Sequence, residues 1–311
     1  MSEEVEIILA SPRGFCAGVK RAIEIVEIAL KEYGSPIYVR HEIVHNRRVV
    51  EDLTKKGAIF VKELEEIPEK SRVIFSAHGV ANHIKVKAKQ LHHLTLDATC
   101  PLVSKVHKQT QNFNDKDYKI ILIGHKGHPE VIGIQGQIEE DLIIIENEFQ
   151  AKSLNLSTYN KIAYVTQTTL SMNDTKKIIN VLKKKFPNIK GPELQDICYA
   201  TQNRQTAVSK LADLSDIVFV VGGENSSNTK RLAEIVEKKK VPVFRVSGKE
   251  EIDNDWLKGK KKIGITAGAS SPEILIEEII DAFKKRYAKV NIHSMEGIEE
   301  KISFKPLNEF S

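Results

Sequence analysis

The sequence predicts an α/β protein made of three similar lobes, each built on a mostly parallel sheet. Short apolar, β-branched runs alternate with amphipathic helical stretches along the chain, a pattern typical of repeated βα units. Polar loops and the three cysteines, Cys16, Cys100 and Cys198, recur in the same order in each third of the chain. Together these observations indicate an internal repeat of βα organisation.

The expected strands are continuous apolar runs, which are typical of parallel strands covered on both faces. In chain order they read VEIILA, PIYVR, RVIFSA, YKIILIG, DLIIIE, KIAYVT, DIVFVVG, VPVFRV and KIGITAG. After the first run, residues 19–34 predict an amphipathic helix with Gly34 as its C-terminal cap. Its apolar stripe is expected to contain Val19, Ala22, Ile23, Val26, Ala29 and Leu30.

The repeat also predicts the limits of the lobes. We expect lobes over residues 1–98, 99–196 and 197–290, followed by a C-terminal tail over 291–311, with the N-terminal strand as a candidate member of the third lobe. In open α/β sheets, ligands bind beyond the carboxyl ends of the strands. A pseudo-threefold arrangement of the lobes would therefore point these ends, and the three cysteines, at a common centre.

Composition narrows the class of protein. The chain has 311 residues, of which 41% are hydrophobic, and its net charge of +5 is spread over many lysines. The sequence has no basic arm and no Arg-rich helix, so it does not indicate nucleic-acid binding. Its net positive charge favours an anionic substrate. The N-terminus carries acids rather than a basic leader, and no apolar run approaches the roughly 20 residues of a membrane span. We therefore expect a cytoplasmic protein with no membrane or nucleic-acid partner.

Each cysteine comes directly before an expected helix. Helix N-termini favour the thiolate form, which is the form that ligates metals. Disulfides are rare in a reducing compartment, and no C-x₂-C pair indicates a zinc site. Three scattered cysteines fit a 4Fe-4S cluster with one iron that has no protein thiolate. The alternative is that each cysteine is a buried apolar side chain.

Six polar loops follow expected strands at repeated distances from the cysteines. In the first loop of each third a polar residue lies 28 or 29 positions after the cysteine, and in the second loop one lies 62 to 72 positions after it; these residues are His45, His128 and Ser226, and His78, Thr168 and Ser270. Helix starts in such loops suit phosphate or diphosphate, whereas the alternative is ordinary helix capping. The candidate ligand-binding residues are His45, His78, His128, Ser226, Ser227, Asn228 and Ser270. His92 and His93 are expected at the surface.

Glu130 is the one carboxyl in these loops that invites a catalytic interpretation. It follows His128 and Pro129 at a strand end, among residues that are mostly neutral or hydrogen-bond donors. A carboxyl beside an anionic ligand tends to keep its proton, which suits a general acid. The alternative is a glutamate that complements the helix dipole.

Nine motifs in collinear order give the sequence a family resemblance. They are PRGFCAGVKRAI, EIVHN, SAHGV, DATCPLVSKVH, GHKGHPEV, TQTTLS, DICYATQNRQ, GGENSSNTKRL and TAGASSPE. In these motifs the chain resembles the 4-hydroxy-3-methylbut-2-enyl diphosphate reductases from about residue 6 to residue 284. This family catalyses the last step of the methylerythritol phosphate route to isoprenoids.

The resemblance implies a trefoil of three α/β domains around a central 4Fe-4S iron–sulfur cluster with one open iron, held by Cys16, Cys100 and Cys198. It implies a reductive dehydroxylation that yields isopentenyl and dimethylallyl diphosphate. Glu130 would relay protons, and Thr168, rather than its neighbour Thr169, would hydrogen-bond the substrate hydroxyl. The substrate would bind among His45, His78, His128, Thr168, Ser226, Ser227, Asn228 and Ser270, all of which except Thr168 would surround the diphosphate, and His128 would also serve catalysis.

The chain has no G-x-G-x-x-G fingerprint for a nicotinamide or flavin cofactor. Electrons should therefore come from a separate donor protein of the ferredoxin or flavodoxin type. Two other functions stay open on the sequence. One is a metal-free enzyme that acts on a phosphorylated metabolite. The other is a cluster-binding sensor, although no helix-turn-helix with a basic recognition helix is evident.

Overall fold

The computed structural model describes residues 4–310, which form two compact units. The first unit contains residues 4–19, 45–49 and 199–302, and the second contains residues 20–44, 50–198 and 303–310. Three sheets run through these units, and every strand pair in them is parallel. The α/β class with parallel sheets is thus confirmed. No helix within the described residues is both long and apolar enough to cross a membrane.

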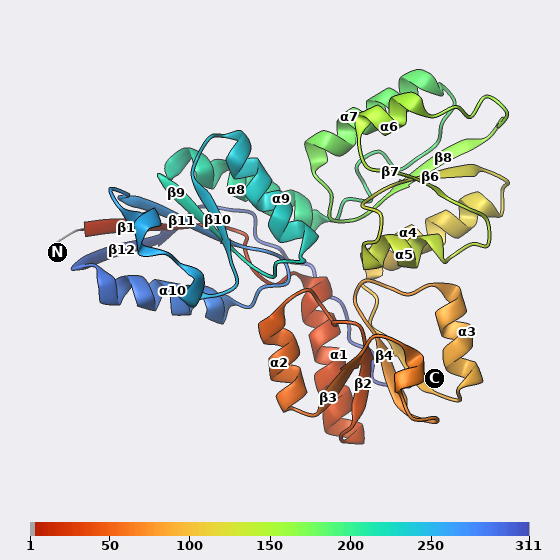
Figure 1. Cartoon of the computed structure of the whole chain (residues 1–311), viewed down its shortest axis with the longest axis horizontal. Helices are drawn as coiled ribbons and strands as arrows, with labels where there is room; N and C mark the ends of the chain where they lie inside the picture. The colour runs from red at the N-terminus through yellow and green to blue at the C-terminus, as the bar shows by residue number, and fades with distance from the viewer. Residues whose placement is uncertain (1–3, 311) are drawn as a thin grey trace. The chain divides into compact units, whose positions relative to one another are not determined.

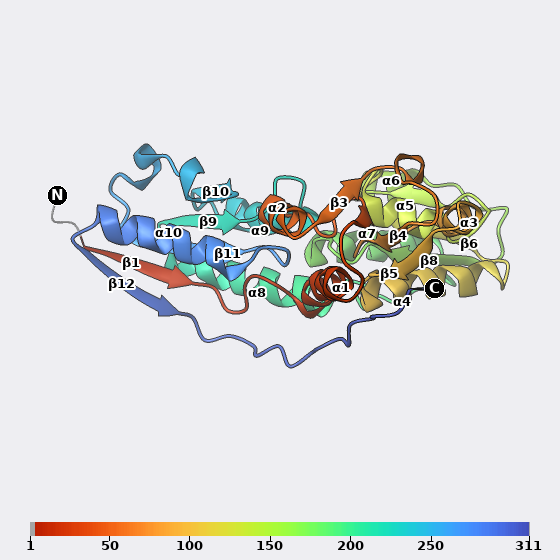
Figure 2. The same cartoon turned by 90° about the horizontal axis from the view of Figure 1, so that it is seen from below.

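The first unit is built on a five-stranded sheet with the order β10-β9-β11-β1-β12. Its strands are β1 (Glu4–Leu9), β9 (Ile217–Val221), β10 (Val243–Val246), β11 (Lys262–Ala267) and β12 (Lys289–Ser294). Its helices are α8 (Tyr199–Leu214), α9 (Ser227–Lys238) and α10 (Glu273–Arg286), with short 3₁₀ turns at Lys249–Glu251 and Asn254–Leu257. The first strand of the chain therefore pairs with strands near its end, and β1 and β12 run side by side in Figure 2.

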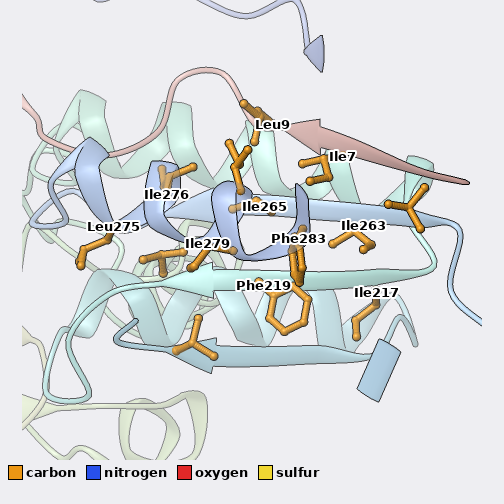
Figure 3. Packing of buried hydrophobic residues seen from close by; sticks show 14 of the residues in the cluster. Ile7, Leu9, Ile217, Phe219, Ile263, Ile265, Leu275, Ile276, Ile279 and Phe283 are labelled. Carbon is orange, nitrogen blue, oxygen red and sulfur yellow. The ribbon is translucent and has the colours of Figure 1, made fainter. Parts of the chain in front are cut away.

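Strand alternation divides the first unit's core into two layers. Odd-numbered residues such as Ile7, Phe219 and Ile265 pack against α10, where Figure 3 shows Phe283 over Phe219. Even-numbered residues such as Val218 and Val220 pack against α8 and α9 on the opposite face. Because each fully buried aliphatic or aromatic side chain contributes about 1.5–3 kcal/mol, both layers hold the sheet rigid beneath its loops.

The second unit contains two sheets. One has the order β3-β2-β4-β5, from β2 (Ile37–Arg40), β3 (Ala58–Val61), β4 (Arg72–Phe75) and β5 (Leu94–Asp97). The other has the order β7-β6-β8, from β6 (Lys119–Ile123), β7 (Ile143–Ile145) and β8 (Ile162–Thr166). The remaining helices are α1 (Ala17–Tyr33), α2 (Arg47–Lys55), α3 (Asn82–Gln90), α4 (Pro101–Asn114), α5 (Pro129–Gln135), α6 (Glu148–Ser153) and α7 (Met172–Lys185), with a 3₁₀ turn at Leu64–Glu66.

Helices cover both faces of the three-stranded sheet. Val106 of α4 and Val131 of α5 pack on one face, whereas Ile178 and Leu182 of α7 pack with α6 on the other (Figure 1). The strands carry buried residues on both faces, and all five residues of β8 are buried. This two-sided burial explains why the sequence of β8 has no polar alternation.

All nine expected apolar runs contain a strand, but three strands were not expected. The missed strands are β3, β5 and β12, and each lies at an edge of its sheet. The edge strand β12 needs few apolar residues, since five of its six residues are exposed.

Two details of burial differ from the sequence interpretation. In α1, Ile25 is fully buried, whereas Ile23 and Leu30 of the expected stripe are only half-buried. The helix ends as expected, because Gly34 adopts a positive φ of 75°. His92 is exposed as expected, but His93 is buried. The expectation for His93 was therefore wrong, and burial lowers the pKa of its ring.

The polar loops follow pairs of adjacent strands in each sheet. Neighbouring strands β2 and β4 end level, with Arg40 opposite Phe75. The pairs β6 and β8, and β9 and β11, also end level. Each sheet therefore presents two polar loops together at the carboxyl ends of adjacent strands, which is where α/β sheets bind ligands.

Candidate active site

Glu130 is a buried carboxyl in the second unit, in the first turn of α5. It is 2% exposed. Its Oε1 accepts a hydrogen bond of 2.7 Å from the Thr168 backbone N–H, and its Oε2 accepts one of 3.1 Å from the Thr168 hydroxyl. Burial raises the pKa of Glu130 to about 7, although the bonds from Thr168 oppose this rise. A carboxyl with this pKa can give up and regain a proton near neutral pH.

Two imidazoles lie on neighbouring loops of the same unit. His128 caps α5, and its Nδ1 accepts a 3.1 Å hydrogen bond from the Glu130 backbone N–H. This bond leaves the proton of the neutral ring on Nε2. The ring of His78 lies edge-on to it with 6.2 Å between centroids, and the Ser76 hydroxyl is 3.3 Å from His78 Nδ1. Both rings are half-buried, so they can meet a ligand.

Cys100 and Cys198 are joined through their backbones to these loops. The Cys100 N–H donates a 3.0 Å bond to the Ala77 carbonyl, next to His78. The Cys198 N–H donates a 3.0 Å bond to the carbonyl of Thr168. Each cysteine directly precedes a helix, α4 and α8 respectively. The second unit therefore brings together Cys100, Cys198, His78, His128, Glu130 and Thr168.

Asp196 is a neighbour of this group that the sequence interpretation missed. Its side chain is fully buried, and its Oδ2 accepts a 3.3 Å bond from the Thr166 N–H. The Lys105 ammonium is 3.7 Å from the other oxygen. Burial raises the pKa of Asp196 to about 6. The available signal was an acid two residues before Cys198, but its burial cannot be read from spacing.

Arg21 is a second missed residue. This guanidinium, on α1, is buried and donates to the carbonyls of Thr99 at 3.0 Å and Ala98 at 3.4 Å. A third bond, of 3.0 Å, goes to the carbonyl of Lys305 in the C-terminal segment. Arg21 thus fixes the backbone that leads into Cys100. The available signal was an arginine beside the apolar stripe of this helix, but its burial cannot be read from the sequence.

The first unit carries the other predicted residues. The Cys16 N–H donates a 3.1 Å bond to the Ala269 carbonyl, next to Ser270. The Ser270 hydroxyl donates a 3.1 Å bond to the carbonyl of His45. Gly223 approaches the same carbonyl so closely that a Cβ there would lie 2.5 Å from the oxygen. Cys16, His45 and Ser270 are therefore held beside one another.

The N-terminus of α9 is a polar cradle in the same unit. Ser226 caps the helix by accepting a 3.3 Å bond from the Thr229 N–H, and Ser227 is the first helical residue. Asn228 is 4% exposed, and both polar atoms of its amide are buried without a hydrogen-bond partner among the described residues. Such buried unpaired groups cost about 1–3 kcal/mol each. The Asn228 amide therefore has hydrogen-bonding capacity that a polar ligand could use.

The chemistry of the cysteines fits a soft metal centre. None of the three forms a disulfide, and each is half-buried next to the start of a helix. Cys16 belongs to the first unit, whereas Cys100 and Cys198 belong to the second. Among residues 4–310, no group of three or more His, Cys, Asp or Glu side chains lies close enough together to hold a metal ion.

Curated proteins similar to the chain are named 4-hydroxy-3-methylbut-2-enyl diphosphate reductase. One from Azoarcus sp. is 50% identical over 299 residues, covering 96% of each chain. One from Burkholderia mallei is 53% identical over 301 residues, covering 97% of this chain and 92% of the relative.

Two solved structures are also similar. The E-1-hydroxy-2-methyl-but-2-enyl-4-diphosphate reductase from Plasmodium falciparum matches with a TM-score of 0.94 and 40% identity, over 98% of this chain and 96% of its own. A second reductase, described as the terminal enzyme of the non-mevalonate pathway, matches with a TM-score of 0.65 and 32% identity, over 90% and 99%. The model of the LytB protein family matches residues 7–284. The chain therefore belongs to the LytB family.

Proposed function

We propose that the chain reduces (E)-4-hydroxy-3-methylbut-2-enyl diphosphate to isopentenyl and dimethylallyl diphosphate. The reaction takes up two electrons and two protons and releases water. The observation that carries the proposal is the buried Glu130–Thr168 pair, whose carboxyl has a pKa of about 7. A reductive loss of hydroxide needs such a proton donor, because hydroxide is a poor leaving group. The similar reductases support the same reaction.

We propose that Cys16, Cys100 and Cys198 hold a 4Fe-4S cluster with one open iron. Family membership supports iron–sulfur dependence, and the three thiols at helix N-termini are suitable ligands. When bound, the cluster supplies the electrons one at a time together with a Lewis-acidic iron. In this proposal the three lobes, with limits near residues 98, 196 and 290, surround the cluster in a trefoil.

The substrate diphosphate is proposed to bind at the loops that carry His45, His78, His128, Ser226, Ser227, Asn228 and Ser270. The unpartnered amide of Asn228 in the first turn of α9 supports this role, since helix N-termini favour anions. The imidazoles add donors, with His128 offering its Nε2 proton. Binding the diphosphate holds the other end of the substrate, which carries the allylic hydroxyl, in position for the reaction.

Glu130 is proposed to deliver a proton to the leaving hydroxyl. Its pKa of about 7 keeps a large fraction protonated at neutral pH. Thr168 orients the carboxyl through two hydrogen bonds, and its hydroxyl is placed to bond the substrate hydroxyl as well. The neighbouring Thr169 instead accepts a 3.0 Å bond from Gln167, which supports Thr168 as the substrate contact. Electrons are proposed to come from a ferredoxin or flavodoxin type protein.

Metal analysis and turnover of anaerobically purified protein test the proposal. We expect about four irons and four sulfides per chain, and conversion of the hydroxylated diphosphate when a chemical reductant is added. Colourless, iron-free protein that is still active would instead support a metal-free enzyme. Iron-loaded protein without turnover would support a cluster sensor. Either outcome would overturn the assignment.

A further inference from the structure

A basic groove of about 960 Å³ lies in the second unit, between α4 and the segment 190–195. Four cationic side chains line it: Arg21, Lys105, Lys108 and Lys190. Its lining includes one carboxylate, Asp97, which already accepts a 2.8 Å hydrogen bond from Lys85. The groove therefore presents a net positive surface that its own residues do not neutralise.

Two of the cations are available to a partner. Lys108 and Lys190 are both exposed, and neither has a carboxylate partner among the residues that the structure describes. The Lys190 ammonium lies 5.8 Å from the centroid of the Tyr118 ring. Lys105 differs, since it is engaged by Asp196 and by the Gln195 carbonyl. Lys108 and Lys190 are thus the cations that an acidic surface would meet first.

The groove reaches the backbone on both sides of Cys100. Thr99 and Pro101 line it directly. Arg21, in its wall, donates to the Thr99 and Ala98 carbonyls, so the wall and this backbone form one rigid piece. Lys105 and Lys108 project from α4, the helix that begins immediately after Cys100. A redox centre held over this groove would have a short covalent route to the Cys100 sulfur.

We propose that this groove docks the electron donor, a small acidic one-electron carrier protein, against the Cys100 loop. The inference rests on the proposed function, which requires such a donor. Opposite charge steers the encounter of two proteins and raises its rate at low salt. Transient redox complexes have small interfaces that suit a site of this kind. The substrate diphosphate has separate loops, so the groove is left to the protein partner.

The test uses the iron-loaded enzyme and compares a groove variant with a control variant. Each is assayed with a protein reductant and with a chemical reductant. Lys108→Glu/Lys190→Glu reverses the two available charges. With an acidic ferredoxin as reductant, we expect kcat/KM for the ferredoxin to fall at least tenfold at low ionic strength. The wild-type value should itself fall as salt is added, because screening weakens steering. With dithionite and methyl viologen, turnover and iron content should stay within twofold of wild type.

Lys152→Glu/Lys176→Glu is the matched control. Both lysines are exposed in the same unit, on α6 and α7, which cover the other face of the β7-β6-β8 sheet from α4. The control should keep the ferredoxin-driven rate. Equal losses in both variants, or no loss in the groove variant, would overturn the proposal. A raised KM for the diphosphate with viologen would assign the groove to a small anion instead. Absence of viologen-driven turnover in wild type would mean that the proposed function itself fails.

Discussion

Opposing effects set the pKa of the Glu130 carboxyl. Burial at 2% exposure disfavours the carboxylate, whereas the backbone N–H and hydroxyl of Thr168 favour it. The nearby carboxyl of Asp196 adds to the rise. Burial dominates, so the pKa settles at about 7 rather than at the 4.5 of an ordinary glutamate. This balance suits a group that donates a proton and must be reloaded in each turnover.

Glu130→Gln should abolish proton delivery while keeping the shape of the site. We expect turnover to fall by about 10²–10⁴-fold, with iron content and substrate binding retained. Single-turnover reduction of the diphosphate by the pre-reduced enzyme measures the chemical step directly. Glu139→Gln, at an exposed position at the far end of the same segment, is the control and should react normally. A fully active Glu130→Gln enzyme would remove Glu130 from the mechanism.

The same substitution predicts a change in how stability depends on pH. Between pH 4.5 and about 7 the folded protein keeps a proton on Glu130 that the unfolded chain has lost, so stability falls as pH rises through this window. Glutamine carries no such penalty. Relative to wild type, Glu130→Gln should gain up to about 3 kcal/mol between pH 5 and pH 8. Urea unfolding of the cluster-free proteins at both pH values measures it, and parallel profiles would contradict it.

Asn228 and Ser226 are both proposed to bind the diphosphate, but only Ser226 also caps α9. The Asn228 amide makes no hydrogen bond within the described residues, so Asn228→Ala should raise KM for the diphosphate at least tenfold without lowering the melting temperature. Ser226→Ala removes a helix cap and should cost about 1 kcal/mol of stability. Thermal shifts with added inorganic diphosphate measure the difference. A wild-type response in Asn228→Ala would show that the amide binds no diphosphate.

At the scale of the elements, sequence pattern was sufficient wherever burial was two-sided. Each of the nine expected apolar runs contains a strand. Pattern failed at β3, β5 and β12, because edge strands are stabilised by pairing with a neighbour that is distant in the chain. It also failed to place Ile25 in the core, since the direction that α1 faces is fixed by the tertiary fold. Similarly, the polar residues around His93 in the sequence suggest an exposed position, whereas tertiary packing buries its ring.

The loop after β4 contains Gly79, where the surrounding atoms leave no room for a larger side chain. Gly79 has a φ of 82°, and a Cβ there would lie 2.6 Å from Cε1 of the buried His107 ring. Gly79→Ala should therefore destabilise the protein by about 1–3 kcal/mol and displace the adjacent His78, raising KM. Gly127 has a similar φ of 83° but open space around it, so Gly127→Ala should cost only about 1–2 kcal/mol of backbone strain. Unfolding free energies and KM of both variants test this, and equal KM values would contradict it.

At the scale of the whole molecule, the candidate residues belong to two units of the chain. Cys16, His45, Ser226, Ser227, Asn228 and Ser270 belong to the first, and Cys100, His78, His128, Glu130, Thr168 and Cys198 to the second. Motif order and loop spacing could select these candidates, because each lies at a strand end or helix start. Asp196 and Arg21 could not be found in this way, since their contribution depends on burial against segments far away in sequence.

This distribution leads to a prediction about cluster assembly. If all three thiolates are ligands, Cys16→Ser should impair loading as severely as Cys100→Ser or Cys198→Ser, although Cys16 belongs to a different unit from the other two. Each variant should fall well below the roughly four irons of a complete cluster and lose turnover. Iron and sulfide analysis under anaerobic conditions measures this. Near-normal iron in Cys16→Ser, with losses only in the other two variants, would mean that the second unit holds the metal alone. The joint three-cysteine site would then have to be abandoned, because a cluster that loses one of only three protein ligands cannot keep its full set of irons.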